Sequence, residues 1–356
     1  MEIFSGLQED LGMECLVRIP YRFHPNLRAV CKSWNLLLSS AIFFNERQRR
    51  GECEEGIVSL HKSPQTESDF DVIICYPLGR FLERLPQIPK QFQLEYTAYH
   101  RCVFVRSKHQ LVIMGLLNRR SDREGVLIFD FLSHKWRVGA DMPCSRCYFA
   151  CAASTTEPLV YIAGGCKRPF KRGFSRPLPE AFVYNVEKNK WDFLPAMNSV
   201  PLLDLCVGAF LDDKFYVVPR QSQRGQVYDP KTRLWTNINT DSNAQYVHSC
   251  VAACRGLWWF TWKECIRGWI NVQEFDNDSN KRSRTDYGQF SAELPDFYTG
   301  FVHGIVPYNG GFFLSAVDPT CGVEYFSFKA RVENYRWCMI GAENSRFIFS
   351  SDSVQI

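Results

Sequence analysis

The sequence predicts a mainly β protein made of repeated four-stranded units, preceded by a short helical segment. The repeats are indicated by three segments that place an aromatic residue seven positions before a tryptophan: VLIFDFLSHKW, AFVYNVEKNKW and GQVYDPKTRLW. Trp136, Trp191, Trp235 and Trp337 are separated by 55, 44 and 102 residues. The last interval is about two periods of roughly fifty residues, and such a period built of strands is typical of β-propeller blades.

The repeat is clearest between Leu159 and Trp191. LVYIAGG is typical of a short buried strand ended by the pair Gly164-Gly165, and AFVYNVEKNKW of a strand, a polar turn and a further strand. A strand that ends in Gly-Gly, followed by a Tyr and then a Trp, resembles the blade of a kelch repeat. The corresponding strands elsewhere lack the glycine pair, so the other repeats are degenerate. The resemblance implies a six-bladed kelch-type β-propeller.

Strand signals divide residues 51–356 into six expected blades. The first has strands at 56–61, 71–76 and 80–85 but no innermost strand before them, and the strand signal at 345–350 has no blade of its own. We therefore expect this C-terminal strand to enter the first blade and close the ring, because an open ring exposes unpaired edges. The remaining blades are expected at 102–138, 149–194, 205–238, 250–290 and 304–340, and five or seven blades are the alternatives.

The first fifty residues carry helical patterns that predict two or three short helices. The apolar face of the first, over residues 7–19, consists of Leu11, Cys15, Leu16 and Ile19. The second runs over residues 26–38, and its face consists of Leu27, Val30, Cys31, Trp34 and Leu37 or Leu38. About forty residues of helix form a poor independent core, so the blades or a partner should support this segment.

The same segment closely resembles an F-box, the motif that docks a protein onto the Skp-type adaptor of a cullin ubiquitin ligase. The resemblance rests on Leu7, Glu14-Cys15-Leu16, Ile19-Pro20 and the more specific VCKSW at 30–34. Family members usually open with Leu-Pro, whereas Gln8 follows Leu7 here. The resemblance implies a helical F-box domain over 1–50 and a kelch-like propeller over 51–356.

The resemblance also implies roles for individual residues. Val30 and Trp34 are expected to hold the helical domain together, while Leu7, Ile19 and Pro20 face the adaptor. The full adaptor-binding set that it implies is Leu7, Leu11, Leu16, Ile19, Pro20, Leu27, Val30 and Trp34.

Composition excludes several classes of protein. A net charge of +4 is too modest to indicate nucleic-acid binding, and no basic leader or run of eighteen apolar residues indicates secretion or a membrane span. We expect a cytoplasmic and/or nuclear location, with the 15 cysteines as small buried thiols.

No motif indicates catalysis. Cys144 and Cys147 form a Cys-x-x-Cys pair, but the second pair that a structural zinc site needs is missing. The sequence contains no Gly-x-Ser-x-Gly elbow and no glycine-rich phosphate loop. We therefore expect no metal, no cofactor and no enzymatic activity.

The loops that join second and third strands should emerge on one face of a propeller, and they are rich in basic residues. We expect a protein substrate with an acidic segment to bind this face, although a charge excess that only keeps the protein soluble is the alternative. Trp262 is expected in a loop beyond the end of a strand, where it could anchor a partner. The candidate substrate-binding residues are Arg119, Arg120, Arg168, Arg172, Arg220, Arg224, Trp262 and Arg267.

An N-terminal F-box followed by kelch-like blades is a recurrent arrangement in plants, and the chain resembles the plant F-box/kelch-repeat family. That resemblance implies a substrate-recognition subunit of an SCF-type ubiquitin ligase. Its F-box would dock the Skp-type adaptor, and through it a cullin-RING ligase, while the propeller binds the protein to be ubiquitinated and degraded. The alternative is a kelch scaffold outside the ubiquitin system, whose helices pack as a cap.

Overall fold

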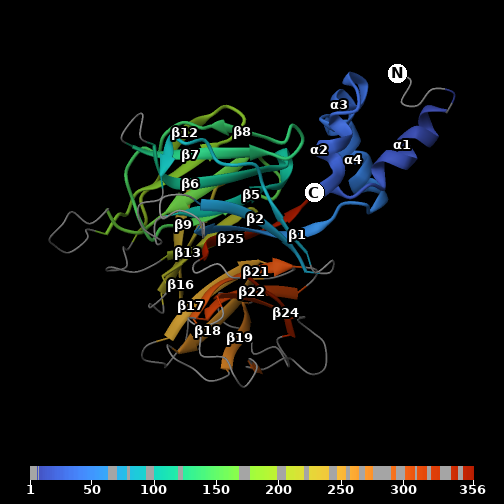
Figure 1. Cartoon of the computed structure of the whole chain (residues 1–356). Helices are drawn as coiled ribbons and strands as arrows, with labels where there is room; N and C mark the ends of the chain where they lie inside the picture. Colours follow the sequence, from blue (N-terminus) through green and yellow to red (C-terminus); the bar gives the residue numbers. More distant parts are fainter. Residues whose placement is uncertain are drawn as a thin grey trace.

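The computed structural model describes residues 6, 8–62, 70–77, 81–93, 100–118, 123–167, 177–198, 206–219, 224–239, 247–253, 257–263, 269–275, 290–293, 301–308, 311–318, 322–328, 338–343 and 348–356. Within these ranges the chain is mainly β, as expected, and its α-helices all lie in the first fifty residues. The helices gather at one side of the sheets, beside β1 and the C-terminus (Figure 1). No described helix is both long and apolar enough to cross a bilayer.

The helical segment consists of α1 (Glu9–Val17), the 3-10 helix η1 (Tyr21–Phe23), α2 (His24–Arg28), α3 (Lys32–Leu38) and α4 (Ala41–Arg50). The expectation of one helix over 26–38 is therefore wrong. Cys31 is extended, with φ −158° and ψ 167°, and its Sγ accepts a hydrogen bond from the backbone N–H of Trp34 at 3.5 Å. Cys31 thus acts as the N-cap of a new helix, so α2 and α3 have different axes.

The described strands form six antiparallel sheets. Sheet one has the order β25-β1-β2-β3, with β1 (Glu55–Lys62), β2 (Phe70–Tyr76), β3 (Phe81–Arg84) and β25 (Ile348–Gln355). Sheet two contains β4 (Phe92–Gln93), β5 (Arg101–Val105), β6 (Gln110–Asn118), β7 (Arg123–Asp130) and β8 (Lys135–Val138). A 3-10 helix, η2 (Arg106–Lys108), joins β5 to β6.

The other four sheets are each built from consecutive strands. Sheet three contains β9 (Ala150–Ala153), β10 (Leu159–Ala163), β11 (Ala181–Asn185) and β12 (Lys190–Leu194). Sheet four contains β13 (Cys206–Leu211), β14 (Lys214–Pro219), β15 (Arg224–Asp229) and β16 (Leu234–Asn239). Sheet five contains β17 (Val247–Ala253), β18 (Leu257–Lys263), β19 (Trp269–Phe275) and β20 (Phe290–Glu293). Sheet six contains β21 (Phe301–Tyr308), β22 (Gly311–Asp318), β23 (Gly322–Phe328) and β24 (Cys338–Glu343).

One strand of each sheet contacts the equivalent strand of the next sheet, in the order β25, β5, β9, β13, β17, β21 and back to β25. The last of these contacts depends on a strand from the end of the chain. β25 pairs with β1 from Gln355 opposite Glu55 to Ile348 opposite His61. The bounds expected for this strand, 345–350, are therefore wrong. Of these residues only 348–350 belong to β25. β25 continues to Gln355 because its partner β1 begins at Glu55.

The seven-residue spacing from an aromatic residue to a tryptophan corresponds to a β-hairpin. In each case the two residues lie directly opposite each other on the last two strands of a sheet. Their ring centroids are 4.8 Å apart in sheets two and three and 5.2 Å apart in sheet four, which is contact distance for aromatic pairs. The pairs are Phe129 with Trp136, Tyr184 with Trp191, and Tyr228 with Trp235.

Each of these tryptophans also ties its sheet to the preceding one. The indole Nε1 donates a hydrogen bond to a backbone carbonyl in the segment that leaves the previous sheet. The donor and acceptor pairs are Trp136 to Pro86 at 2.7 Å, Trp191 to Ala140 at 3.1 Å and Trp235 to Pro195 at 2.8 Å. The spacing seen in the sequence therefore reports both the hairpin and the junction between neighbouring sheets.

The three hairpin turns share one backbone form. Each begins with an Asp or Asn whose side-chain oxygen accepts a hydrogen bond at 2.8 Å from a backbone N–H two or three positions later, which is an Asx turn. Two positions before each tryptophan stands a residue with positive φ: His134 at 57°, Asn189 at 52° and Arg233 at 59°. The repeat is thus conserved at the level of single backbone angles within this chain.

The glycine pair after β10 allows another segment to approach closely. Gly165 has φ +77°, and a Cβ added there would lie 2.3 Å from the carbonyl oxygen of Cys147 and 2.8 Å from the backbone nitrogen of Phe149. A larger residue would displace the connection from β8 to β9 and would be strained in this conformation. This explains why the doublet appears where LVYIAGG meets its neighbour.

Candidate functional site

Arg47 of α4 organises the helical segment. Its guanidinium is 1% exposed and its Nη1 donates to the carbonyl oxygens of Val17 and Ile19, at 2.7 and 2.6 Å. Its Nη2 donates to the carbonyl oxygen of Glu52 at 2.8 Å. Burial lowers the pKa of Arg47, although an arginine remains charged at neutral pH. One buried side chain therefore joins the end of α1, α4 and the segment that leads into β1.

The small core of the helical segment differs from the expected one. It contains Leu16, Val17, Leu38 and Phe43, each no more than 1% exposed, with Leu27 and Trp34 partly buried against it. Val30, which was expected to hold the domain together, is 61% exposed because it lies in the break between α2 and α3. That assignment is wrong for Val30, whereas Trp34 does contact the core.

The expected apolar face of the first helix is also only half correct. Leu16 is fully buried, so it supports the fold and is not available to a partner without unfolding. Leu11 is 51% exposed and Cys15 is exposed, because α1 turns Leu16 and Val17 toward α3 and α4 instead. Ile19 and Pro20 are partly buried, and Leu7 lies outside the described residues.

The helices carry most of the exposed large apolar side chains. Of the nine such side chains among the described residues, five belong to the helical segment. They are Leu11 at 51% exposure, Phe23 at 43%, Val30 at 61%, Leu36 at 68% and Ile42 at 72%. Leu36 and Ile42 were missed by the sequence analysis, which assigned the LLL run at 36–38 by helical spacing to Leu37 or Leu38. This concentration of exposed apolar side chains in one short segment makes it the candidate protein-binding site.

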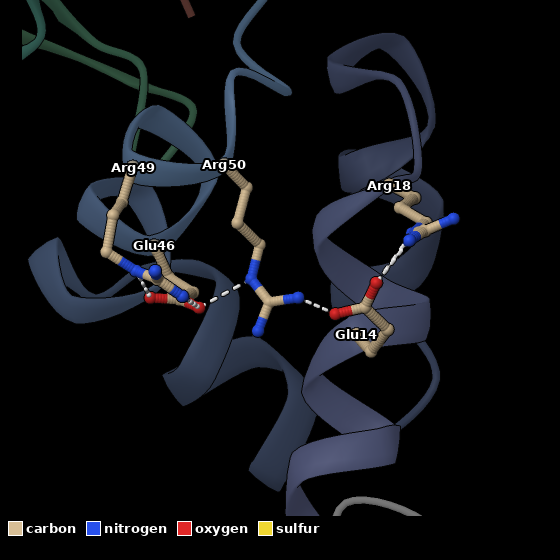
Figure 2. Close-up of polar contacts among 5 residues, drawn as sticks. All are labelled: Glu14, Arg18, Glu46, Arg49 and Arg50. Carbon is tan, nitrogen blue, oxygen red and sulfur yellow. Dashed lines mark hydrogen bonds and ion pairs between the residues drawn. The ribbon is translucent and has the colours of Figure 1, made fainter.

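A cluster of charges links α1 to α4 at the surface (Figure 2). Glu14 of α1 pairs with Arg50 of α4 and with Arg18, whose Nε donates to it at 2.8 Å. Glu46 accepts from Arg50 at 2.5 Å and from Arg49 at 2.7 and 2.9 Å. Hydrogen bonds from Arg49 lower the pKa of Glu46. Exposed ion pairs contribute little stability, so this cluster orients the two helices more than it stabilises them.

On the other side, the helices pack against sheets one and two. Tyr21 and Phe44, 2% and 5% exposed, belong to one core cluster with strand residues of both sheets. The Tyr21 hydroxyl donates to the carbonyl oxygen of Phe131 at 2.9 Å, and burial raises its pKa well above the usual value. Phe44 lies on the ring of His109, with 3.6 Å between centroids. The sheets therefore supply the support that a small helical segment needs.

Next to the loops of the expected substrate face, the described residues include a cluster of buried polar groups around Glu124 and Arg146. Glu124 is 4% exposed in β7 and accepts from Ser145 Oγ at 2.6 Å and from the backbone N–H of Arg146 at 3.0 Å. Arg146 is fully buried and donates to the carbonyl oxygens of Gly164 and Glu180, at 3.2 and 3.0 Å. These two carbonyls flank the basic segment 167–176, so Arg146 holds its two ends together.

The Cys-x-x-Cys pair, Cys144 and Cys147, flanks Arg146 in this cluster of buried polar groups. Cys147 is buried and pairs through its backbone with Cys166, and the two Sγ atoms lie 3.3 Å apart. Burial raises the pKa of Cys147, as expected for a structural thiol. Cys144 Sγ accepts a hydrogen bond from Arg146 Nη2 at 3.0 Å. In the part of the chain that the structure describes, no group of three or more His, Cys, Asp or Glu residues is arranged to hold a metal.

The candidate substrate-binding side chains lie outside the described part. Residues 119, 120, 168, 172, 220 and 267 are not described, and only the backbones of Arg224 and Trp262 are, in β15 and β18. The loop position expected for Trp262 is wrong, since it pairs with His248 within the strand. β18 is longer than expected because β17 begins at Val247 and pairs along its full length.

Comparisons with known proteins agree with these features. A family model for the Kelch motif matches residues 147–198, which include Cys166, the glycine pair and the hairpin of sheet three. Three F-box/kelch-repeat proteins of Arabidopsis thaliana are similar over 67% of this chain. At1g80440 is 31% identical over 252 residues and At1g15670 is 32% identical over 257, each with 68% of its own length covered. At2g44130 is 28% identical over 277 residues, and the match spans 65% of its length. With its Kelch motif and its similarity to these relatives, the chain belongs to the F-box/kelch-repeat protein family.

Proposed function

We propose that this protein is the substrate-recognition subunit of an SCF-type ubiquitin ligase. The helical segment, residues 1–50, is an F-box domain that binds a Skp-type adaptor and through it a cullin-RING ligase. Residues 51–356 form a six-bladed kelch-type propeller that binds the protein to be ubiquitinated and degraded. The protein acts in the cytoplasm and/or nucleus and binds neither nucleic acid nor membrane.

The observation that carries this proposal is the exposed apolar surface of the helical segment. Leu11, Val30, Leu36 and Ile42 are each more than half exposed although the segment is short. The other side of the same segment is already buried against the sheets through Tyr21. Several large exposed apolar side chains in one short segment make it a candidate protein-binding site, and an adaptor that covers them is the partner that this proposal assigns.

The order of contacts among the sheets supports the propeller. Six antiparallel sheets, five of four strands and one of five, that each contribute one strand to a closed cycle of contacts are the arrangement of a propeller with six blades. The pairing of β25 with β1 supports closure of the ring by the C-terminal strand. Such a closed ring protects the edges of its inner strands and offers loop faces for binding.

The proposed role is not catalytic. A receptor that holds its target near an activated ubiquitin raises the effective concentration of the reacting groups without supplying a reacting group of its own. The receptor must provide one specific contact to the adaptor, a second specific contact to the substrate, and a defined distance between these two contacts.

The adaptor contact is tested by replacing Leu36 and Ile42 with Asp in the full chain. Both side chains are exposed, so the fold should survive, and circular dichroism checks that it does. Co-purification with a Skp-type adaptor should weaken by about 30-fold or more, as for the loss of central apolar contacts. The matched control is Leu82→Asp, an exposed apolar residue of β3 that should not affect the adaptor. Unchanged co-purification of the double variant would contradict the proposal.

We assign the substrate to the face that carries the basic loops, through the residues 119, 120, 168, 172, 220, 224, 262 and 267 named above, and expect the target segment to be acidic. Reversal of two charges, Arg168→Glu with Arg172→Glu, should weaken substrate capture and leave adaptor binding intact. Capture by the parent should also fall with salt, because exposed charges are screened within about 8 Å at physiological ionic strength. Equal capture by the double variant and the parent would remove this loop from the binding site.

A scaffold outside the ubiquitin system is the second candidate. The burial of Tyr21 and Phe44 against the sheets favours this second candidate, because a scaffold's helices would pack against its sheets as a cap. A scaffold of this kind would not bind a Skp-type adaptor, so the same co-purification separates the two functions.

A further inference from the structure

The turn between β7 and β8 carries a large aromatic residue at its first position and an apolar residue at its second, where its two counterparts carry smaller apolar residues and then charged ones. After the Asp or Asn that opens each turn, the residues are Phe131-Leu132 in sheet two, Val186-Glu187 in sheet three and Pro230-Lys231 in sheet four. All three turns have the same backbone form, so the formation of the turn does not require the apolar residues. Their presence in sheet two needs another reason.

That reason is the helical segment, which lies on this turn. The Tyr21 hydroxyl and Arg28 Nη2 donate to the same acceptor, the carbonyl oxygen of Phe131, at 2.9 and 3.2 Å. The rings of Tyr21 and Phe131 meet edge to face with 5.6 Å between centroids. Because hydrogen bonds restrict direction as well as distance, two donors from η1 and α2 on one acceptor limit rotation of the helices over the turn.

A second contact limits tilting of the helical segment about the Phe131 carbonyl oxygen. Phe44 of α4 packs on His109, which follows η2, and the carbonyl oxygen of His109 accepts from the backbone N–H of Phe131 at 3.1 Å. Ile356, fully buried, belongs to the same core cluster as Phe44 and Tyr21. Elements from both ends of the chain and from two sheets therefore meet under the helices.

The polar part of this contact is costly in stability. The Nε and Nη1 atoms of Arg28 are buried and have no hydrogen-bond partner among the described residues. Buried donors without partners destabilise a fold, and an apolar side chain would fill the same place without that cost. An arginine at this position is better explained by the direction that it imposes than by the stability that it adds.

We propose that Tyr21 and Arg28 are positioning residues that fix the orientation of the adaptor-binding helices relative to the ring of sheets. An adaptor bound by the helices would then be held at one angle and distance to the face that binds the substrate. This inference rests on the proposed function. It adds to that function a defined geometry, on which the effective concentration at the acceptor lysine depends.

The orientation can be measured directly in the full chain. Spin labels are introduced as non-natural amino acids at Gln48 of α4 and Lys188 in the turn between β11 and β12, because the native cysteines would take a thiol label. Pulsed electron resonance should give one narrow distance distribution in the parent. In the double variant Tyr21→Phe with Arg28→Met the distribution should broaden at least twofold, while circular dichroism shows that the chain stays folded.

Two further variants serve as controls. Arg22→Met removes a neighbouring exposed arginine and should leave the distribution as narrow as in the parent. Tyr21→Phe with Arg28→Lys keeps one cationic donor near the Phe131 carbonyl and should restore part of the narrow distribution. A distribution in the Tyr21→Phe, Arg28→Met variant as narrow as that of the parent would overturn the proposal.

A second readout connects orientation to function. In a reconstituted ligase, the lysines of this chain that become ubiquitinated are identified by mass spectrometry. The parent should be modified at a small set, and the double variant at a larger one, with adaptor affinity unchanged within about twofold, because neither residue belongs to the exposed apolar set. An unchanged lysine pattern together with a broadened distribution would overturn the link to ubiquitin transfer. Absence of adaptor binding by the parent would instead contradict the proposed function, and the distance distribution would still decide whether Tyr21 and Arg28 fix the helices.

Discussion

The turn between β7 and β8 and the turn between β11 and β12 have the same backbone and different surroundings. Both open with an Asx turn and place a residue of positive φ two positions before a tryptophan. Under the helices these positions carry Phe131 and His134, whereas sheet three has Val186 and Asn189. The comparison teaches that the repeat determines the hairpin, while a few side chains on its turn determine what the hairpin binds.

The largest effect is expected when the turn between β7 and β8 receives the residues of the turn between β11 and β12. Phe131 is fully buried and Leu132 packs against the same core. Phe131→Val with Leu132→Glu should lower the free energy of unfolding by about 3 kcal/mol or more, because it removes core volume and introduces a carboxylate. Urea denaturation measures this, and limited proteolysis after Arg49 and Arg50 should become faster. A loss under about 1 kcal/mol would show that the helices do not depend on the turn.

The tryptophans test whether the repeats are equivalent in energy as well as in geometry. Each indole N–H donates to one carbonyl of the preceding sheet. We expect Trp→Phe at position 136, 191 or 235 to cost about 1 to 2 kcal/mol, from a lost hydrogen bond and a smaller ring. Thermal unfolding of the three variants should give similar shifts. A much larger effect at one position would show that its junction carries an additional role.

His134 gives the first turn a dependence on pH that the second turn lacks. Burial lowers the pKa of His134 from 6.5 to about 4, and burial likewise lowers the pKa of His109 to about 4. Since these folded-state values lie below the unfolded one, the unfolded chain binds protons first as the pH falls. The free energy of unfolding should therefore decrease from about pH 6.5 toward pH 4.

His134→Asn, which installs the residue found in sheet three, should make that decrease shallower. Melting temperatures between pH 7.5 and 5 provide the measurement, and part of the decrease should remain because burial also lowers the pKa values of His109 and His24. Parallel curves for parent and variant would mean that His134 takes up a proton as readily in the folded protein as in the unfolded chain, so that its burial has no energetic consequence.

The smallest effect is expected for the reverse change in the second turn. Glu187 has a side chain 56% exposed and pairs with Lys108 at 2.6 Å. Glu187→Leu should change the free energy of unfolding by no more than about 0.5 kcal/mol, as for other exposed positions. A large destabilisation would show that this turn also supports a neighbouring element.

Features that depend on local spacing could be predicted from the sequence. The interval from Tyr184 to Trp191 identifies a hairpin because its two strands are adjacent in the chain. The pairing of β25 with β1 is distant in sequence, yet a first sheet that lacked one strand and a last strand without a sheet indicated it. Helical periodicity, in contrast, did not show that Leu16 would be buried and Leu11 exposed, since either side of α1 offers apolar residues.

The contact between helices and sheets could not be predicted from periodicity. Tyr21 and Phe131 are 110 positions apart, and their hydrogen bond joins a side chain to a backbone carbonyl that any residue would provide. One signal was present: Leu132 occupies a turn position where the two counterpart turns carry Glu187 and Lys231. For the substrate face, the basic side chains lie outside the described residues, and their role remains a proposal based on charge.

The central claim is that the helices present an apolar face to an adaptor while the sheets hold them in place. Amide hydrogen exchange of the full chain, with and without a saturating Skp-type adaptor, tests both parts at once. We predict slower exchange on binding in α1, α3 and the first turn of α4, which carry Leu11, Leu36 and Ile42, and no change in the turn that contains Phe131. Exchange that is unchanged throughout the helices, or slowed only in the sheets, would contradict the account.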